Sequence, residues 1–150
     1  MNLSENFTLE EMIASETAAR HNIDQTPSNE VLMNLRRLAL FLEDVRKLLG
    51  KPIQISSAYR SPLANEAVGG KKTSQHCRGA AADIKVKGMT PDQVVRVIIK
   101  SGLPYDQVIR EFSDPIKGGG WTHVSISNGK DIAPRKQALI IDSKGSRAFV

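Results

Sequence analysis

The chain has little of several residue types on which common functions depend. Its single cysteine, Cys77, excludes an intramolecular disulfide and is consistent with a reducing compartment. Its four Phe, two Tyr and one Trp are not interleaved with basic residues, so the chain lacks the stacking platform that single-stranded nucleic acid requires. No apolar run approaches the roughly 18 residues of a membrane span. These absences leave a globular protein without an obvious membrane or nucleic-acid role.

The length and charge of the chain indicate its number of domains and the kind of partner it could bind. A chain of 150 residues without repeats suits one compact domain with a sizeable core. The net charge of +5 comes from scattered basic residues or pairs such as Arg36-Arg37 and Lys71-Lys72, which favours an anionic partner and suits cell-wall polymer and nucleic acid equally. The N-terminus has neither a basic n-region nor an apolar h-region, so we expect a cytoplasmic protein without a signal peptide.

The pattern of apolar residues predicts an α+β fold. Capping signals begin helices at Thr8, Ser28 and Thr90, and Gly50 and Gly102 end the second and third of these. Short β-prone segments then alternate with Gly and Pro, and they read IQISSAY, AAADIKV, QVIREF, WTHVSI and QALII. We expect a single domain with a helical part over about 8–50, a mainly antiparallel sheet over about 51–142, and a tail over 143–150.

A histidine and an aspartate stand seven residues apart in SQHCRGAAADIKV. Gly79 lets the chain bend between His76 and Asp83, and the alanines leave room beside the backbone. In GGGWTHVSI, strand alternation points His123 away from the aliphatic side. Two histidines and one carboxylate suit a catalytic zinc, which keeps a fourth position open. The alternative is that each histidine is an ordinary core or surface residue.

The spacing Ser74-x-His76-x-x-Gly79-x-Ala81-x-Asp83, followed by Trp121-x-His123, resembles the metal-binding motif of the zinc D-alanyl-D-alanine carboxypeptidase family. That family includes the L-alanyl-D-glutamate endopeptidases that bacteriophages use as endolysins. The segments SSAYRSPLANEAVGG and FTLEEMIASETAARHNID also resemble its small phage and prophage members, so the likeness covers most of residues 7–127.

The resemblance implies a role for each matching residue. His76, Asp83 and His123 would hold zinc, and Arg60 would contact the substrate or the developing oxyanion as a fixed cationic donor. Zinc in such a site lowers the pKa of its water and polarises the scissile carbonyl. Ser74 would either support a ligand or substrate through a hydrogen bond or cap the loop, and both interpretations stay open.

The general base departs from one pattern of the family. Many relatives carry an acidic residue three positions before the final histidine, where this chain has Gly120. Glu111 is the chosen base because it ends QVIREF before the chain returns as WTHVSI, so a hairpin would bring it beside His123. Asp114 is the second candidate, although its Asp-Pro sequence is typical of a turn.

The leading hypothesis is a zinc metallopeptidase, a hydrolase that cuts peptidoglycan stem peptides as an endolysin-like endopeptidase. A D-Ala-D-Ala carboxypeptidase is the nearest alternative, and a noncatalytic zinc-containing wall-binding or phage-structural module is another. We expect a monomer with no nucleic-acid partner, made in the host cytoplasm and acting on the cell wall after release. A basic nucleic-acid-binding domain is a weaker hypothesis.

Overall fold

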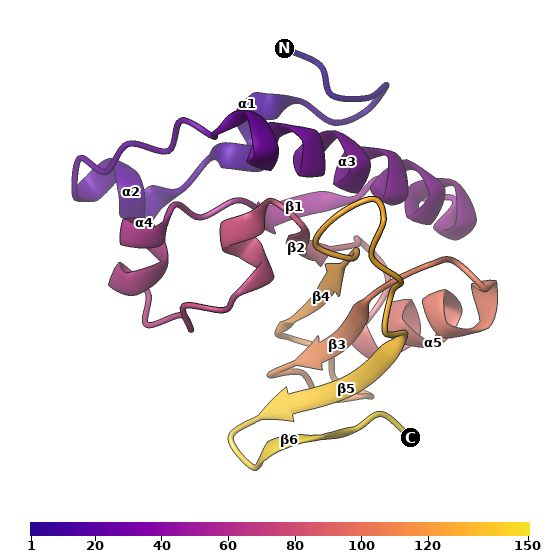
Figure 1. Cartoon of the computed structure of the whole chain (residues 1–150). Helices are drawn as coiled ribbons and strands as arrows, with labels where there is room; N and C mark the ends of the chain where they lie inside the picture. Colours follow the sequence, from indigo (N-terminus) through magenta and orange to yellow (C-terminus); the bar gives the residue numbers. More distant parts are fainter.

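A computed structural model describes residues 1–150, which fold around one mixed sheet of six strands in the order β1-β2-β4-β3-β5-β6 (Figure 1). The strands are Gln54–Ser57 (β1), Ala81–Lys85 (β2), Gln107–Glu111 (β3), Trp121–Ser125 (β4), Gln137–Asp142 (β5) and Gly145–Ala148 (β6). The helices are Leu9–Ile13 (α1), Glu16–Arg20 (α2), Asn29–Leu49 (α3), Pro62–Ala67 (α4) and Pro91–Ser101 (α5), with a 3-10 turn at Gln75–Arg78 (η1).

Three helices begin at the predicted capping residues, and two of them, α3 and α5, end at the predicted glycines Gly50 and Gly102. Thr8 forms a capping box with Glu11 at the start of α1, and Thr90 forms one at the start of α5. The Ser28 hydroxyl accepts a hydrogen bond from the amide of Val31 and starts α3, which ends at left-handed Gly50 (φ 65°). These side chains satisfy amides that a helix terminus leaves free. Although α3 is the longest helix, no helix has the length and apolar character that a membrane span requires.

The core lies between α3, α5 and one face of the sheet. Because strand side chains alternate between faces, residues at even-numbered positions of β2, β3 and β4 point toward these helices. Their buried apolar contacts include Leu38, Leu42, Val95, Ile98, Ala82, Ile84, Val108 and Val124. The odd-numbered positions of β2 and β4 face the opposite side, as the alternation of WTHVSI predicts.

The predicted α+β single-domain class is confirmed, and the sheet is mainly antiparallel. Its one parallel pair joins β3 to β5, with Ile109 opposite Leu139. Residues 145–148, which lie within the expected tail, form β6 on β5. The short helices α2 and α4 and the turn η1 are further elements that the sequence pattern did not predict. Figure 1 shows α2 and α4 next to each other beside the sheet.

Candidate metal centre

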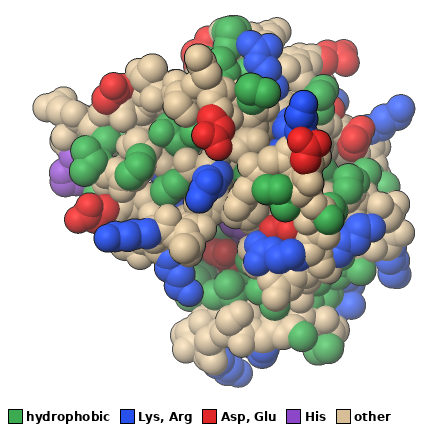
Figure 2. Space-filling model, in the orientation of Figure 1, with side chains coloured by type: hydrophobic (Ala, Val, Ile, Leu, Met, Phe, Trp, Pro, Cys, Tyr) green, Lys and Arg blue, Asp and Glu red, His purple; other side chains and the backbone are tan.

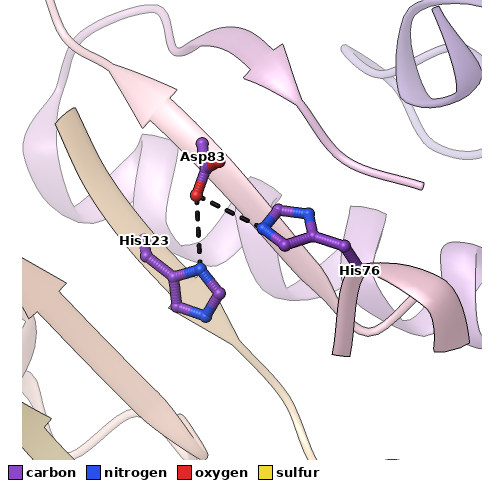
Figure 3. A group of neighbouring side chains, drawn as sticks. All are labelled: His76, Asp83 and His123. Atoms are coloured by element: carbon purple, nitrogen blue, oxygen red, sulfur yellow. Dashed lines mark hydrogen bonds and ion pairs between the residues drawn. The ribbon is translucent and has the colours of Figure 1, made fainter. Parts of the chain in front are cut away.

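Three side chains from three elements converge on the side of the sheet opposite α5. His76 comes from η1, Asp83 from the middle of β2 and His123 from the middle of β4. The antiparallel register of β2 and β4 places Asp83 directly opposite His123. Their possible metal-binding atoms all lie within 4.8 Å of one another, and Figure 3 shows both rings directed at the same carboxylate. The predicted convergence of a loop histidine with two strand residues is therefore present.

Hydrogen bonds define which nitrogen of His76 is free. Its Nδ1 lies 2.6 Å from the carbonyl oxygen of Ala58, and because a carbonyl only accepts, Nδ1 carries the proton. The other nitrogen, Nε2, lies 3.4 Å from Oδ1 of Asp83. A ligating histidine commonly donates its second N–H to a carbonyl, which fixes its tautomer and orientation. The Ala58 carbonyl thus prepares His76 to bind a cation through Nε2.

His123 approaches from the other side with its Nδ1 nitrogen, 3.2 Å from the same Oδ1 of Asp83 (Figure 3). A tetrahedral zinc with bonds of about 2.0–2.1 Å requires ligand atoms roughly 3.4 Å apart. The two measured separations from Asp83 agree with that requirement. The ring centroids of His76 and His123 are 5.2 Å apart at 69°, so the two rings meet edge to face and do not stack in parallel. The donor types and spacing therefore fit zinc.

The electrostatics of Asp83 favour its charged form. Burial opposes ionisation, but the interactions of Asp83 with His123 and His76 outweigh burial and hold the pKa of Asp83 well below its usual range. Its side chain is only 14% exposed, and its neighbours Ala81 and Ala82 are fully buried and small. A buried carboxylate whose only ion-pair partners within the chain are imidazoles is a site prepared for a cation.

Ser74 and Arg60 flank His76 in different ways. The Ser74 hydroxyl accepts a hydrogen bond from the His76 amide at 3.2 Å and caps η1, which corresponds to the capping interpretation. The Arg60 amide donates to the His76 carbonyl at 3.1 Å, so its backbone is tied to η1. Its guanidinium forms no ion pair within the chain, and its buried Nε has no hydrogen-bond partner. Arg60 therefore retains donors for a bound group.

Glu111 lies on the same face of the sheet as His123. Ile109 is opposite His123 and Glu111 is opposite Trp121, so Glu111 is a diagonal neighbour of His123, a separation of about 7 Å between strand positions. Burial raises the pKa of Glu111, Asp83 adds to the rise, and His123, Trp121 and Arg60 oppose it. The pKa of Glu111 therefore responds to the ionisable groups of the site.

Trp121 adds an aromatic side chain to the surroundings of the site. In the sequence, only its place in the motif pointed to it. Its ring packs against Phe112, with centroids 5.6 Å apart. Its buried indole nitrogen makes no hydrogen bond of ordinary length, although the indole N–H contributes to lowering the pKa of Glu111. We conclude that the indole lies near the carboxyl without being bonded to it. Strand alternation was the available signal, because it puts Trp121 and His123 on one face.

The backbone explains why position 120 holds glycine and not an acid. Gly120 has φ 61°, a left-handed conformation that side chains rarely adopt. A Cβ atom there would overlap the carbonyl oxygens of Glu111 and Phe112. An acidic residue at this position would require the β3–β4 connection to move, so an acid for the site has to come from elsewhere.

The remaining candidates lie outside the cluster. Asp114 is exposed, and its carboxylate accepts hydrogen bonds from the amides of Ile116 and Lys117 as part of a turn. His21 is exposed at the end of α2. Cys77 is half-buried, and burial raises the pKa of its thiol, which disfavours the thiolate that binds metals. The Ala58 carbonyl was missed because a backbone partner leaves no residue-type signal.

Comparison with known proteins identifies a family for this chain. A family model described as Peptidase M15 matches residues 5–124. This span contains all three cluster residues together with Arg60 and Glu111. No curated protein matches the chain. Since the family model covers most of the sequence, the chain belongs to the peptidase M15 family.

Proposed function

We propose that the protein is a zinc metallopeptidase that hydrolyses peptide bonds in peptidoglycan stem peptides, as an endolysin-like endopeptidase. The observation that carries this proposal is the convergence of His76, Asp83 and His123 within 4.8 Å, with Glu111 on the same face. Membership of the M15 family supports a peptidase. The three cluster residues would hold zinc, which when bound polarises a scissile carbonyl and acidifies a water.

The chain's own groups have separate tasks in this mechanism. The Ala58 carbonyl holds the His76 ring in one tautomer, so that the ligand is oriented before substrate arrives. Glu111 accepts the proton of the attacking water and delivers it to the leaving amine, and its half-buried position limits competition from solvent. Arg60 donates from its free guanidinium to charge that develops on the carbonyl oxygen.

The shape of the site supports cleavage within a peptide more than removal of a terminal residue. Figure 2 shows histidine and acidic side chains at the bottom of a hollow that opens to solvent, with Lys and Arg side chains around it. An open groove accepts a polymer, whereas a carboxypeptidase requires a closed end that recognises a terminal carboxylate.

The experiment is digestion of purified peptidoglycan followed by mass spectrometry, with chelator and with zinc restored. New peptide termini that vanish on chelation and return with zinc are expected, and their masses identify the bond. Cleavage that persists in metal-free protein would refute the zinc mechanism. Zinc binding without cleavage would favour a noncatalytic wall-binding or phage-structural module, and release of terminal D-Ala alone would favour a carboxypeptidase.

The biological setting is part of the same proposal. Endolysin-like action would have the protein accumulate in the host cytoplasm and reach the wall after release. The net charge of +5 would assist contact with an anionic wall. Association with intact walls should then weaken as salt rises toward about 0.5 M, because screening shortens the reach of surface charges. Retention that does not change with salt would assign wall affinity to other contacts.

A further inference from the structure

Apolar side chains continue the face of the sheet that carries the candidate metal centre. The register puts Ile109 opposite His123 on β4 and opposite Leu139 on β5. The next row of the same face, two positions along β3, has Glu111 at its centre and an apolar residue on each side. We name these apolar side chains, together with one neighbour that follows β3, the apolar strip: Ile109, Phe112, Trp121, Leu139 and Ile141.

The apolar strip is separate from the main core, which lies on the helix side of the sheet. Only Ile109 is buried in it, and none of the five residues belongs to the core cluster or packs against it. Ala138, next to Leu139 on β5, does pack against that cluster, as strand alternation requires. Figure 2 shows hydrophobic side chains on the lower side of the hollow, where Figure 1 shows β5. The strip is therefore a second apolar surface, open to solvent beside the candidate site.

The backbone at Phe112 turns its ring into the apolar strip. Strand alternation would send this residue to the helix side, because the even-numbered positions of β3 point there. Phe112 instead has φ 49°, and its ring packs beside that of Trp121, with centroids 5.6 Å apart and planes inclined at 32°. The Phe112 amide donates to the carbonyl of Ile141 at 2.9 Å, which fixes this turn of the chain. A left-handed conformation is strained for a bulky side chain, and such strain gathers at functional sites.

Folding alone does not account for the position of the Phe112 ring. The residue is 53% exposed although it touches Trp121, so much of its apolar surface stays in water and contributes little to stability. Its backbone conformation is unfavourable as well. An aromatic ring that is both strained and exposed, next to the proposed general base Glu111, is explained by contact with a bound group.

The chemistry of the apolar strip suits a sugar ring better than a stem peptide. Its five side chains carry no charge, and two of them are aromatic. A pyranose has a face of C–H groups that can pack on the electron-rich face of an aromatic ring, while its hydroxyl groups stay in water at the edge. A stem peptide offers small alanine methyl groups and charged groups, and charged groups lose free energy on an apolar surface. In peptidoglycan each stem peptide is joined to the sugar N-acetylmuramic acid.

The distance between the metal centre and the apolar strip fits this linkage. Trp121 and His123 are two positions apart on β4 and point to the same face, a separation of roughly 6.8 Å along a strand. An extended peptide covers the same distance in about two residues. A sugar on the strip would therefore be joined to a peptide whose scissile bond, within about two residues of the sugar, lies at the metal centre.

We propose that the apolar strip binds the N-acetylmuramic acid ring that carries the stem peptide, with Phe112 and Trp121 against its C–H face. The enzyme would then select stem peptides still attached to glycan over free peptides and cut close to the sugar. This inference rests on the proposed function, because it places the scissile bond at the metal centre.

The test compares two substrates that differ only in the group on the first amino group, N-acetylmuramoyl-L-Ala-γ-D-Glu-L-Lys-D-Ala and N-acetyl-L-Ala-γ-D-Glu-L-Lys-D-Ala. The wild-type enzyme should cleave the sugar-bearing substrate with about fivefold higher kcat/KM, the size expected of one aromatic contact. The difference should lie in KM, since the sugar contact is the same in the ground and transition states. High salt should leave the ratio of the two kcat/KM values unchanged, because the contact involves no ion pair. Equal cleavage of both substrates would overturn the sugar site while the proposed peptidase function stands.

Phe112→Asn removes the ring and keeps a residue that tolerates the left-handed backbone. The ratio of the two kcat/KM values should fall close to one in this variant, and a loss of folded protein cancels in that ratio. Ile116→Asn is the control, because it removes another exposed apolar side chain of the same β3–β4 connection, one outside the strip, and it should keep the wild-type ratio. A wild-type ratio in the Phe112 variant, with both substrates slowed equally or not at all, would overturn the proposal.

A binding measurement separates this inference from failure of the peptidase itself. Trp121 is the only tryptophan of the chain, so its fluorescence reports on the apolar strip directly. The disaccharide N-acetylglucosaminyl-N-acetylmuramic acid, titrated onto metal-free protein, should change this fluorescence to saturation, and Phe112→Asn should require about fivefold more sugar. Saturable binding in a protein that cleaves neither substrate would support the sugar site and refute the peptidase. No change at millimolar disaccharide would overturn the sugar site even in an active enzyme.

Discussion

Asp83 and Asp92 are both poorly exposed aspartates next to the same sheet, and they have opposite kinds of partner. Asp92 lies on the helix side and receives two guanidinium groups, with Arg110 Nη1 at 2.6 Å and Arg96 Nε at 2.8 Å. Asp83 lies on the open side and is met only by the imidazoles of His76 and His123. The chain thus supplies permanent cations to one carboxylate and none to the other.

The difference separates a structural ion pair from a ligand site. A buried carboxylate with paired arginines is neutralised in every state of the folded protein, and removing one partner leaves an uncompensated charge. A carboxylate that has only imidazole partners gains most from a divalent cation. Perturbed pKa values alone do not distinguish the two, because the pKa values of both Asp83 and Asp92 are lowered.

The largest effect is expected from Asp83→Asn, which keeps the shape of the side chain and removes its charge. Zinc content, measured by elemental mass spectrometry after dialysis, should fall from about one ion toward none. Peptidoglycan cleavage should fall by more than about three orders of magnitude, since the metal contributes several kcal/mol to the transition state. A variant that keeps both zinc and turnover would remove Asp83 from the ligand set.

Glu111→Gln should separate metal binding from proton transfer on the open face. Turnover should fall about 10²- to 10⁴-fold because the amide cannot take a proton. Zinc content should stay at the wild-type value, since Glu111 lies outside the ligand cluster. Asp114→Asn is the control and should retain activity, as that carboxylate serves a turn. Full activity in the Glu111 variant together with loss in the Asp114 variant would reverse the assignment.

Asp92→Asn should have the opposite effects to Asp83→Asn: it should lower stability and leave zinc binding and activity unchanged. Arg110, with its side chain only 9% exposed, would lose its charge partner, and the free energy of unfolding in urea should fall by about 3 kcal/mol. Zinc content and turnover per folded molecule should be unchanged. A stable Asp92 variant with lost activity would contradict the division between the two faces.

The loss of folding stability at low pH should depend on the aspartates that are paired with arginines. Burial opposes ionisation of Asp92 and Asp106, but hydrogen bonds from Arg96 and Arg110 in one case and from Arg135 in the other lower both pKa values. A lowered folded-state pKa contributes stability that is complete above the unfolded-state value of about 3.9 and is lost as pH falls through the folded value. Urea unfolding of metal-free protein should therefore weaken below about pH 4.

Asp106→Asn is the matched variant for this pH effect. Its unfolding free energy should be lower than that of wild type near neutrality, and the two curves should converge as pH falls, because protonation removes the same interaction that the substitution removes. Parallel curves with no convergence would show that the Asp106–Arg135 pair does not control the acid transition.

The smallest effect is expected from Ser74→Ala. The hydroxyl caps η1 by accepting from the His76 amide, and loss of such a cap costs about 1 kcal/mol. Because His76 keeps its bond to the Ala58 carbonyl, zinc affinity should weaken by less than tenfold in a chelator competition. Complete loss of zinc would mean that Ser74 orients the ligand directly. Ser61→Ala, which removes the α4 cap, is the control.

Local chemistry made part of this structure predictable. The caps of α1, α3 and α5 depend on residues within one turn, and strand alternation depends on neighbours along the chain. The three cluster residues were predicted from motif spacing together with a family resemblance. By contrast, the parallel pairing of β3 with β5 joins segments whose connection carries no signature of its partner.

The contacts that escaped prediction, in the site and in the core, join segments far apart in sequence. The His76–Ala58 hydrogen bond links η1 to the chain after β1 through a backbone atom. The Asp92–Arg110 pair joins α5 to β3 across 18 positions, and many pairings of the basic and acidic residues are equally compatible with the sequence. The sequence shows only that Gly120 stands where many relatives have an acid. The structure gives the reason, because the positive φ of Gly120 and the nearby carbonyls leave no room for a side chain.

The direct pairing of Asp83 with His123 across β2 and β4 has a consequence for how the chain folds. The two residues are 40 positions apart, so the binding site comes into existence only when a slow, non-local strand pairing has formed. A shift of one residue in that pairing would send one of the two side chains to the helix side. Only the correct register can gain binding free energy from a cation. A bound ion would therefore stabilise chains in which β2 and β4 are correctly aligned over chains in which they are shifted.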